Sequence, residues 1–290
     1  MSAEKIRVTI DVFSGRENPV IEFSGKSLAT FKERVGPERL YKLDEVQKLP
    51  FPPLGYRGMV IETVGKRQKG LPSRFRVAGG RGYSPDSIFD VIDSELEDFV
   101  CGSIPKEFPI EDIKHKIMEF RDWYLRWEDF IGHVGRVDPV IPCPCGPLYE
   151  PDWWNASARR PYNNCYNYAC NYLTNSFAQP GRATGHMYSA LNCDQVKAGA
   201  VSDGLIDTPG ADNQCPSEGH LVALVIWPGV DFHWYRKGRD GMWSHKPGGT
   251  NATNLDNSGH TIVDPRTADR GGYTTFCTFM NVRHGHIMLK

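Results

Sequence analysis

The chain has 290 residues, of which 40% are hydrophobic and 24% charged, and its 34 basic side chains nearly cancel its 35 acidic ones. This composition is typical of a folded globular protein and excludes a chain kept disordered by low hydrophobicity and high net charge. Without a net field, and without a run of roughly 18 apolar residues, neither a nucleic-acid partner nor a membrane partner is expected.

The first part of the sequence predicts two strands and a helix. Residues 6–13 alternate between apolar and polar side chains, which indicates a half-buried strand. Turn-forming residues follow, and residues 20–23 favour a return strand. Ser27 is placed to cap a short helix that ends at Gly36.

Residues 56–64 and 74–78 are predicted to form two more strands. Gly79-Gly-Arg-Gly82 suits a hairpin turn better than a phosphate-binding loop, because it lacks the Lys-Ser/Thr of such a loop. From Ile110 to Trp127 apolar side chains recur every three or four residues, which predicts an amphipathic helix.

A domain boundary is predicted near Asp138, where a proline-rich stretch that denies regular helix or central strand begins. The expected fold class is α+β. Residues 1–137 would form a small N-terminal α+β domain and residues 138–290 a second domain.

In the second domain a helix is expected to precede a sheet. The helix would begin near Asn163 or Asn164. Its packed side would be formed by Tyr166, Tyr168, Ala169, Tyr172 and Leu173. The apolar run 220–227 predicts a central strand, and further strands are expected over 231–236 and 241–244.

Cys165 is the candidate nucleophile of an enzyme. At the start of the predicted helix, unpaired N–H groups and the positive end of the helix dipole favour a thiolate. The same N–H groups, with the side chain of Asn163 or Asn164, would hold an oxyanion. The ordinary alternative is that Cys165 is a buried apolar side chain or half of a disulfide.

Two histidines are candidates for completing this site. His233 and His245 lie on neighbouring predicted strands joined by a short turn, so a hairpin would place both imidazoles on one face of the sheet. We expect His233 to act as the general base and His245 to orient it, provided that the helix bearing Cys165 docks on that face.

The order of these residues resembles that of papain-like cysteine hydrolases, especially the NlpC-type cell-wall endopeptidases and their CHAP-type relatives. Asn-Asn-Cys165-Tyr-Asn-Tyr takes the position of the nucleophile, His233-Trp-Tyr-Arg that of the base, and Trp-Ser-His245-Lys-Pro-Gly that of the third residue. Over about residues 160–250, the resemblance implies a helix packed on an antiparallel sheet. It also implies a hydrolase or acyl transferase that acts on a peptide, glycopeptide or other amide substrate without a cofactor.

Four further segments look like parts of poorly characterised proteins related to a molluscan insoluble shell-matrix protein. They are Val-Phe-Ser-Gly-Arg-Glu-Asn-Pro19, Asn-Asn-Cys-Tyr-Asn-Tyr-Ala169, Phe-Ala-Gln-Pro-Gly-Arg182 and Trp-Ser-His-Lys-Pro-Gly-Gly-Thr250. This likeness implies that residues 1–30 and 140–280 form one evolutionary unit. It keeps a non-catalytic structural or binding role open as the alternative function.

Other assignments also stay open. His220 is a rival for the general base, and Asp231 and Asp264 are reserve orienting residues. Zinc held by Cys165, His233 and His245 is the alternative use of those side chains, although no metal is expected. For Cys143-Pro-Cys145, disulfides are the ordinary expectation; the candidate partners are Cys193, Cys215 and Cys277.

Large aromatic rings near the proposed site residues suit the wall of a cleft for an extended peptide or glycan. The alternative is that half or more of them belong to the core. The candidates are Trp153, Trp154, Tyr166, Trp234 and Trp243.

The cell compartment is left open by the sequence. The first seven residues lack the apolar stretch of a secretory signal, so a cytoplasmic location is expected by default, and a secreted one if a signal was removed. Asn155-Ala-Ser and Asn251-Ala-Thr have the form of N-glycosylation acceptors, which matter only in a secretory compartment.

Overall fold

The computed structural model describes residues 4–35, 37–42, 52–65, 71–84, 87–91, 93, 95–127 and 142–290. The chain divides into two compact units. The first unit takes in the described residues of Met1–Val12, Asn18–Pro52 and Tyr56–His133, and the second those of Phe13–Glu17, Pro53–Gly55 and Val134–Lys290. The domain boundary predicted near residue 138 lies outside the described residues.

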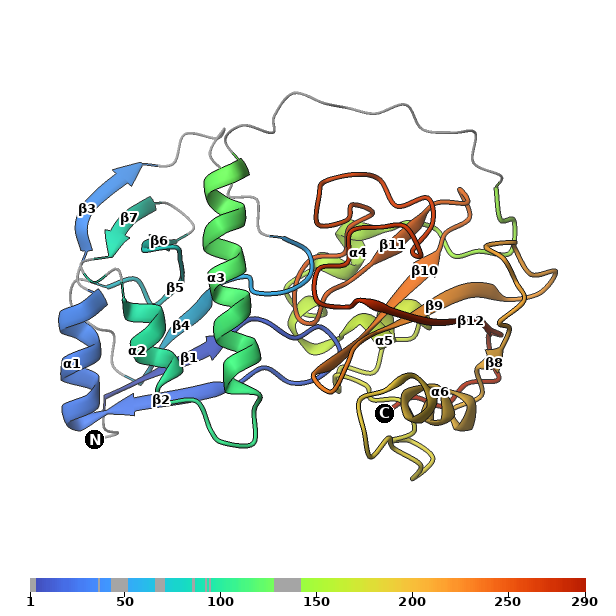
Figure 1. Ribbon diagram of the computed structural model, residues 1–290, viewed down its shortest axis with the longest axis horizontal. Coiled ribbons are helices and arrows are strands. Elements are labelled where there is room, and N and C mark those ends of the chain that lie inside the picture. The colour runs from blue at the N-terminus through green and yellow to red at the C-terminus, as the bar shows by residue number, and fades with distance from the viewer. Residues whose placement is uncertain are drawn as a thin grey trace. The chain divides into compact units, whose positions relative to one another are not determined.

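The first unit is built on a seven-stranded antiparallel sheet in the order β2-β1-β4-β5-β6-β7-β3 (Figure 1). Its strands are β1 (Lys5–Ile10), β2 (Val20–Ser24), β3 (Pro37–Lys42), β4 (Met59–Val64), β5 (Arg74–Ala78), β6 (Arg81–Tyr83) and β7 (Ser87–Val91). Its helices are α1 (Gly25–Val35), α2 (Leu96–Cys101) and α3 (Ile110–Trp127).

The alternation of apolar and polar residues, together with particular turn residues, explains these elements. Ile6, Val8 and Ile10 of β1 are buried, as the alternation requires, while Arg7 on the other face is exposed. Gly79 and Gly80 form the two-residue turn between β5 and β6 with positive φ angles, which glycine adopts without strain. Helix α1 begins two residues before Ser27, so Ser27 is not the N-cap residue; its hydroxyl instead accepts a hydrogen bond from the backbone N–H of Ser24, the residue before the helix.

The second unit is built on a five-stranded antiparallel sheet in the order β11-β10-β9-β12-β8. Its strands are β8 (Ile206–Asp207), β9 (His220–Trp227), β10 (Asp231–Lys237), β11 (Trp243–His245) and β12 (Thr275–Val282). Its helices are α4 (Pro151–Asn155), the 3-10 turn η1 (Arg160–Tyr162), α5 (Cys165–Ala169) and α6 (Cys193–Ser202). Both units combine helices with antiparallel sheets, so the predicted α+β class is confirmed.

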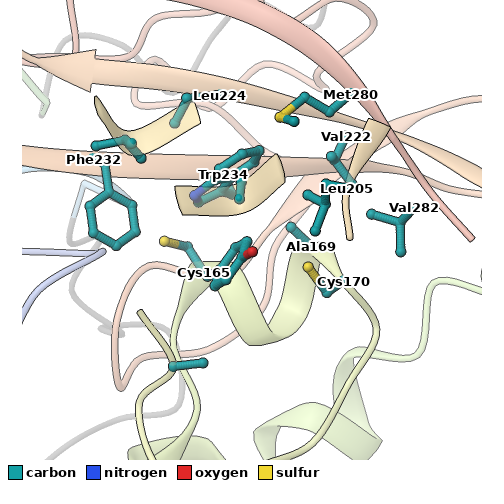
Figure 2. Packing of buried hydrophobic residues seen from close by; sticks show 14 of the residues in the cluster. Cys165, Ala169, Cys170, Leu205, Val222, Leu224, Phe232, Trp234, Met280 and Val282 are labelled. Atoms are coloured by element: carbon teal, nitrogen blue, oxygen red, sulfur yellow. The ribbon is translucent and has the colours of Figure 1, made fainter. Parts of the chain in front are cut away.

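The main core of the second unit lies where α5 and α6 pack on one face of this sheet. Figure 2 shows Cys165 and Ala169 of α5 beneath Phe232 and Trp234 of β10, with apolar side chains of β9 and β12 alongside. Helix α5 is shorter than predicted. It ends at Ala169, and Asn171 adopts a positive φ of 51°, which ordinary helix geometry excludes.

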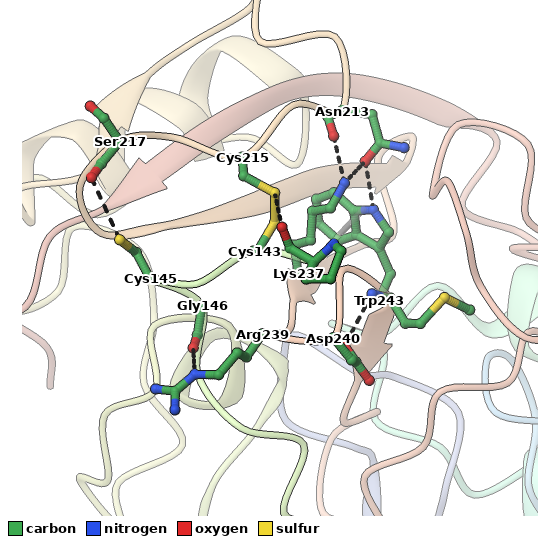
Figure 3. The surroundings of a disulfide bond; sticks show 12 residues. Cys143, Cys145, Gly146, Asn213, Cys215, Ser217, Lys237, Arg239, Asp240 and Trp243 are labelled. Atoms are coloured by element: carbon green, nitrogen blue, oxygen red, sulfur yellow. Dashed lines mark hydrogen bonds between the residues drawn. A yellow bond between two sulfur atoms is a disulfide. The ribbon is translucent and has the colours of Figure 1, made fainter. Parts of the chain in front are cut away.

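Two disulfides lie in the second unit. Cys143 pairs with Cys215 and Cys193 pairs with Cys277, with Cα–Cα distances of 5.5 and 5.3 Å. Cys145 remains outside them, and its thiol donates to the Ser217 carbonyl (Figure 3). Each disulfide therefore joins segments more than 70 residues apart in sequence.

Candidate functional site

Cys165 occupies the first turn of α5, where the sequence placed it. Asn164 is the N-cap residue, since its side-chain oxygen accepts from the N–H groups of Tyr166 and Asn167 at 3.1 and 3.2 Å. The side-chain oxygen of Asn167 in turn accepts from the backbone N–H of Asn164, which completes a capping box. The short helix is thus fixed at its N-terminus by side chains that the local sequence supplies.

The amides of Asn163 and Asn164 are fully used by the protein itself. Asn164 donates to the carbonyls of Gly15 and Ala178, at 2.9 and 2.8 Å. The side-chain oxygen of Asn163 accepts from the backbone of Thr174 and Asn175. Both side chains hold loops in place, and neither is presented to a ligand as an oxyanion donor would be.

The thiol of Cys165 is sealed in the apolar core. Its exposed fraction is 0%, and it lies against Phe232 and Trp234 (Figure 2). Burial raises the pKa of the thiol well above its ordinary value, and the negative charge of Asp231 acts in the same direction. The helix end that was expected to favour the thiolate is therefore outweighed by desolvation, and Cys165 stays protonated.

His233 and His245 are brought together, as the hairpin geometry predicted. Tyr235 of β10 pairs with His245 of β11, so His233 and His245 share a face of the sheet. Nε2 of His233 lies 2.8 Å from Nδ1 of His245, and the two rings meet at 79°.

That face is the one opposite to Cys165. Side chains alternate along a strand, and Phe232 and Trp234 point toward α5, so His233 between them points away. The structure therefore corrects the docking assumed for the helix: Cys165 is on one side of the sheet and both imidazoles are on the other. The same separation means that Cys165, His233 and His245 are not arranged as a set of zinc ligands.

The hydroxyl partner of His233 is Ser14, which the sequence did not single out. Ser14 Oγ lies 2.9 Å from His233 Nδ1, and His245 Nε2 lies 3.0 Å from the carbonyl of Leu255. A carbonyl only accepts, so in neutral rings His245 Nε2 carries its proton, His233 Nε2 donates to His245, and Ser14 donates to His233. In that tautomeric state the four groups form a row of hydrogen bonds with one direction; Ser14 Oγ also lies 2.9 Å from the hydroxyl of Tyr273 and 3.2 Å from the carbonyl of Phe232.

Asp231 anchors the segment that carries Ser14. Its carboxylate accepts from the backbone N–H groups of Ser14, Gly15 and Arg16 at 2.7, 3.1 and 3.0 Å, and from the hydroxyl of Tyr273 at 2.5 Å. Burial raises the pKa of Asp231, and these hydrogen bonds oppose the rise. A side chain at Gly15 would collide with the Phe232 carbonyl, since a Cβ there would lie 2.3 Å from that oxygen.

His220 and Asp264 have other partners than Cys165 and His233. Nε2 of His220 lies 2.7 Å from the carbonyl of Ala169, at the end of α5 remote from Cys165. Burial lowers the pKa of His220 from 6.5 to about 3, so the ring is neutral and donates to that carbonyl. Asp264 accepts from Arg266, with which it forms an ion pair at 2.6 Å.

Of the five aromatic cleft candidates, only Trp153 is exposed, at 43%. Trp154, Tyr166, Trp234 and Trp243 are buried side chains. The indole N–H of Trp243 donates to Asn213 (Figure 3), and the hydroxyl of Tyr166 donates to Asp203. A cleft wall needs exposed rings, so these four side chains serve the core instead.

The comparisons with known proteins give a relative that is a shell-matrix protein by name. Over 140 residues the chain is 46% identical to Insoluble matrix shell protein 1 of Ruditapes philippinarum. The aligned residues make up 48% of this chain and 91% of the relative. The chain belongs to the family of this shell-matrix protein. The relation predicted from the four quoted segments is thereby confirmed.

No family model matches the chain, and no solved structure matches it. The resemblance to papain-like hydrolases therefore rests on residue order and spacing alone. No helix within the described ranges is long and apolar enough to cross a membrane.

Proposed function

We propose that the chain is a non-catalytic structural or binding component of an insoluble extracellular matrix. The observation that carries this proposal is the burial of Cys165 on the sheet face opposite to His233 and His245. The family relation supports the same function, since the relative is named as an insoluble matrix protein.

A cysteine hydrolase needs a thiol that substrate reaches and an imidazole within hydrogen-bond distance of it. Here both nitrogens of His233 are engaged, one by Ser14 and the other by His245. The Cys165 thiol faces Phe232 and Trp234 instead. Turnover by this cysteine would need α5 to leave the core of the second unit.

The row of Ser14, His233 and His245 has the order of a serine nucleophile, a base and an orienting residue. Burial argues against catalysis here as well. Ser14 and both histidines have exposed fractions of 0%, and the N–H groups of Ser14 and Gly15 are bound to Asp231 rather than pointing at a place for an oxyanion. The row is better understood as a buried polar network that fixes the 13–17 segment to the sheet.

Two disulfides within one unit favour an oxidising compartment, as a matrix role requires. They join distant segments of the second unit and so restrict its unfolded state. A protein that persists in an extracellular matrix is expected to gain from such cross-links.

Sequential extraction of the tissue that produces the protein tests the proposal. Material is extracted with salt, then detergent, then urea, and an antibody against the chain locates the protein in each fraction. We expect it in the residue left by salt and detergent. Recovery of all the protein in the first salt extract would contradict a matrix role.

A matched variant tests whether this partition depends on the thiol of Cys165. Cys165→Ala removes the thiol but leaves a small apolar side chain. If the protein is a structural component, the variant expressed in the same cells partitions between fractions like the unaltered chain.

A further inference from the structure

Two acceptor triplets for N-linked glycans lie beside each other in the second unit. The side-chain oxygen of Asn155 accepts from the backbone of Ala252, the middle residue of the Asn251-Ala-Thr triplet, at 2.7 Å. The two triplets are therefore neighbours in the fold, and the surroundings of their asparagines can be compared directly.

Asn251 has the surroundings that a glycan needs. It is exposed, and its Oδ1 accepts from Nη1 of Arg160 at 3.1 Å. Its Nδ2, the atom that receives the sugar, makes no hydrogen bond to any residue that the structure describes. The hydroxyl of Thr253, the third residue of the triplet, accepts a hydrogen bond from the backbone N–H of Leu255 at 3.1 Å, and the backbone of Thr253 pairs with His245.

Asn155 lies in a more restricted place. It is half-buried as the last residue of α4, next to Trp154, which is 2% exposed and packs on Tyr168. Its side-chain oxygen holds Ala252. A bulky, solvated oligosaccharide on Asn155 would have to emerge from between α4 and the loop that this hydrogen bond fixes.

The disulfides supply the second, independent observation. Cys143–Cys215 and Cys193–Cys277 are bonds of an oxidising compartment, and N-glycosylation takes place in the same secretory route. An exposed triplet in such a protein is an acceptor in chemistry as well as in form.

We propose that Asn251 carries an N-linked oligosaccharide and that Asn155 does not. Nδ2 of Asn251 forms a bond to the first sugar carbon of a lipid-pyrophosphate-linked oligosaccharide and loses a proton. The bond from that carbon to the phosphate oxygen breaks, and the lipid pyrophosphate leaves. The proposal stands apart from the matrix role, because a glycan on a protein of any extracellular function would fit it.

The test is expression of the full chain behind a cleavable secretion signal in eukaryotic cells. Secreted and cell-retained protein are both treated with an amidase that removes N-glycans and converts the modified Asn to Asp. Peptide mass spectrometry in heavy-oxygen water then locates the converted residue. We expect conversion at Asn251 and none at Asn155. Removal of the glycan should change the gel mobility of the protein by the amount expected for one oligosaccharide.

Four variants control for the identity of the site. Asn251→Gln and Thr253→Ala should each abolish the shift, Thr253→Ser should retain it because the hydroxyl remains, and Asn155→Gln should leave it unchanged. Conversion at Asn155, at both residues, or at neither in the unaltered chain overturns the proposal. The mapping uses the unaltered chain, so a variant that fails to fold does not affect the result.

Discussion

Acidification is expected to destabilise the second unit through His220. The ring is buried, donates to the Ala169 carbonyl, and has its pKa lowered to about 3, against 6.5 in an unfolded chain. Between these values the unfolded chain binds a proton that the folded chain does not, so the free energy of unfolding falls as the pH falls below 6.5. At about 1.36 kcal/mol per tenfold change in proton affinity, the full effect is about 5 kcal/mol at most.

At a pH of about 4.5 the expected loss from this residue is about 2–3 kcal/mol, because the solution is then about two pH units below the unfolded pKa. Urea unfolding followed by tryptophan fluorescence at neutral pH and at about pH 4.5 measures the loss. Since other groups titrate too, the quantity to compare is the loss in the unaltered protein minus the loss in His220→Gln.

Gln at position 220 keeps an N–H that can donate to Ala169 and has no proton to gain. His284→Gln is the matched control, because His284 is exposed and its ring lies 5.3 Å from that of His220. The control should lose nearly as much stability on acidification as the unaltered protein, because the charge of His284 is the smallest of the causes that lower the pKa of His220. If His220→Gln does so as well, His220 is not the buried neutral group described here.

Three further outcomes are expected. Asp231→Ala should lower the free energy of unfolding by about 3–5 kcal/mol, because several buried donors lose a charged acceptor, and Asp231→Asn should cost less; a loss under about 1 kcal/mol in urea unfolding would contradict the anchoring role. Replacing Cys193 and Cys277 together by Ser should lower the free energy of unfolding by about 4 kcal/mol, as for any long closed loop. In the unaltered protein, reductant should lower the melting temperature at least as much as this double substitution does, because it opens both disulfides. Gly15→Ala should lower the melting temperature, because the added methyl meets the Phe232 carbonyl; an unchanged melting temperature would show that the segment does not lie where it is described.

Local periodicity was enough to predict much of the fold. The apolar run of β9 is a central strand, paired by β10 on one side and β12 on the other. The hairpin argument also placed His233 and His245 on one face, and the register bears this out, since His245 pairs with Tyr235, two residues from His233.

The alternation of side chains along a strand does not determine the sheet face on which α5 packs, because that depends on tertiary packing. Every residue of β10 is buried, so the strand has no polar, solvated face that would exclude the helix. One signal was present: Phe232 and Trp234 form the more apolar face, and a helix with Cys165 and Ala169 on its packed side buries more apolar surface there.

Ser14 could not be found from spacing at all. It is 219 residues from His233 in sequence, and its position depends on Asp231 and on the collision that keeps residue 15 a glycine. The only sequence signal was its place in the segment Val-Phe-Ser-Gly-Arg-Glu-Asn-Pro, one of the four that suggested the relation to a shell-matrix protein.

The central claim is that Cys165 is a core residue and not a nucleophile, and cysteine alkylation tests it most directly. The native protein is treated with iodoacetamide for increasing times, labelled sites are read by peptide mass spectrometry, and the rates are compared with those in urea. Cys145 is exposed and outside the disulfides, so it serves as the internal standard. We expect Cys145 to react in the native state and Cys165 to react only as the protein unfolds; alkylation of Cys165 in the native state faster than in urea would contradict the claim.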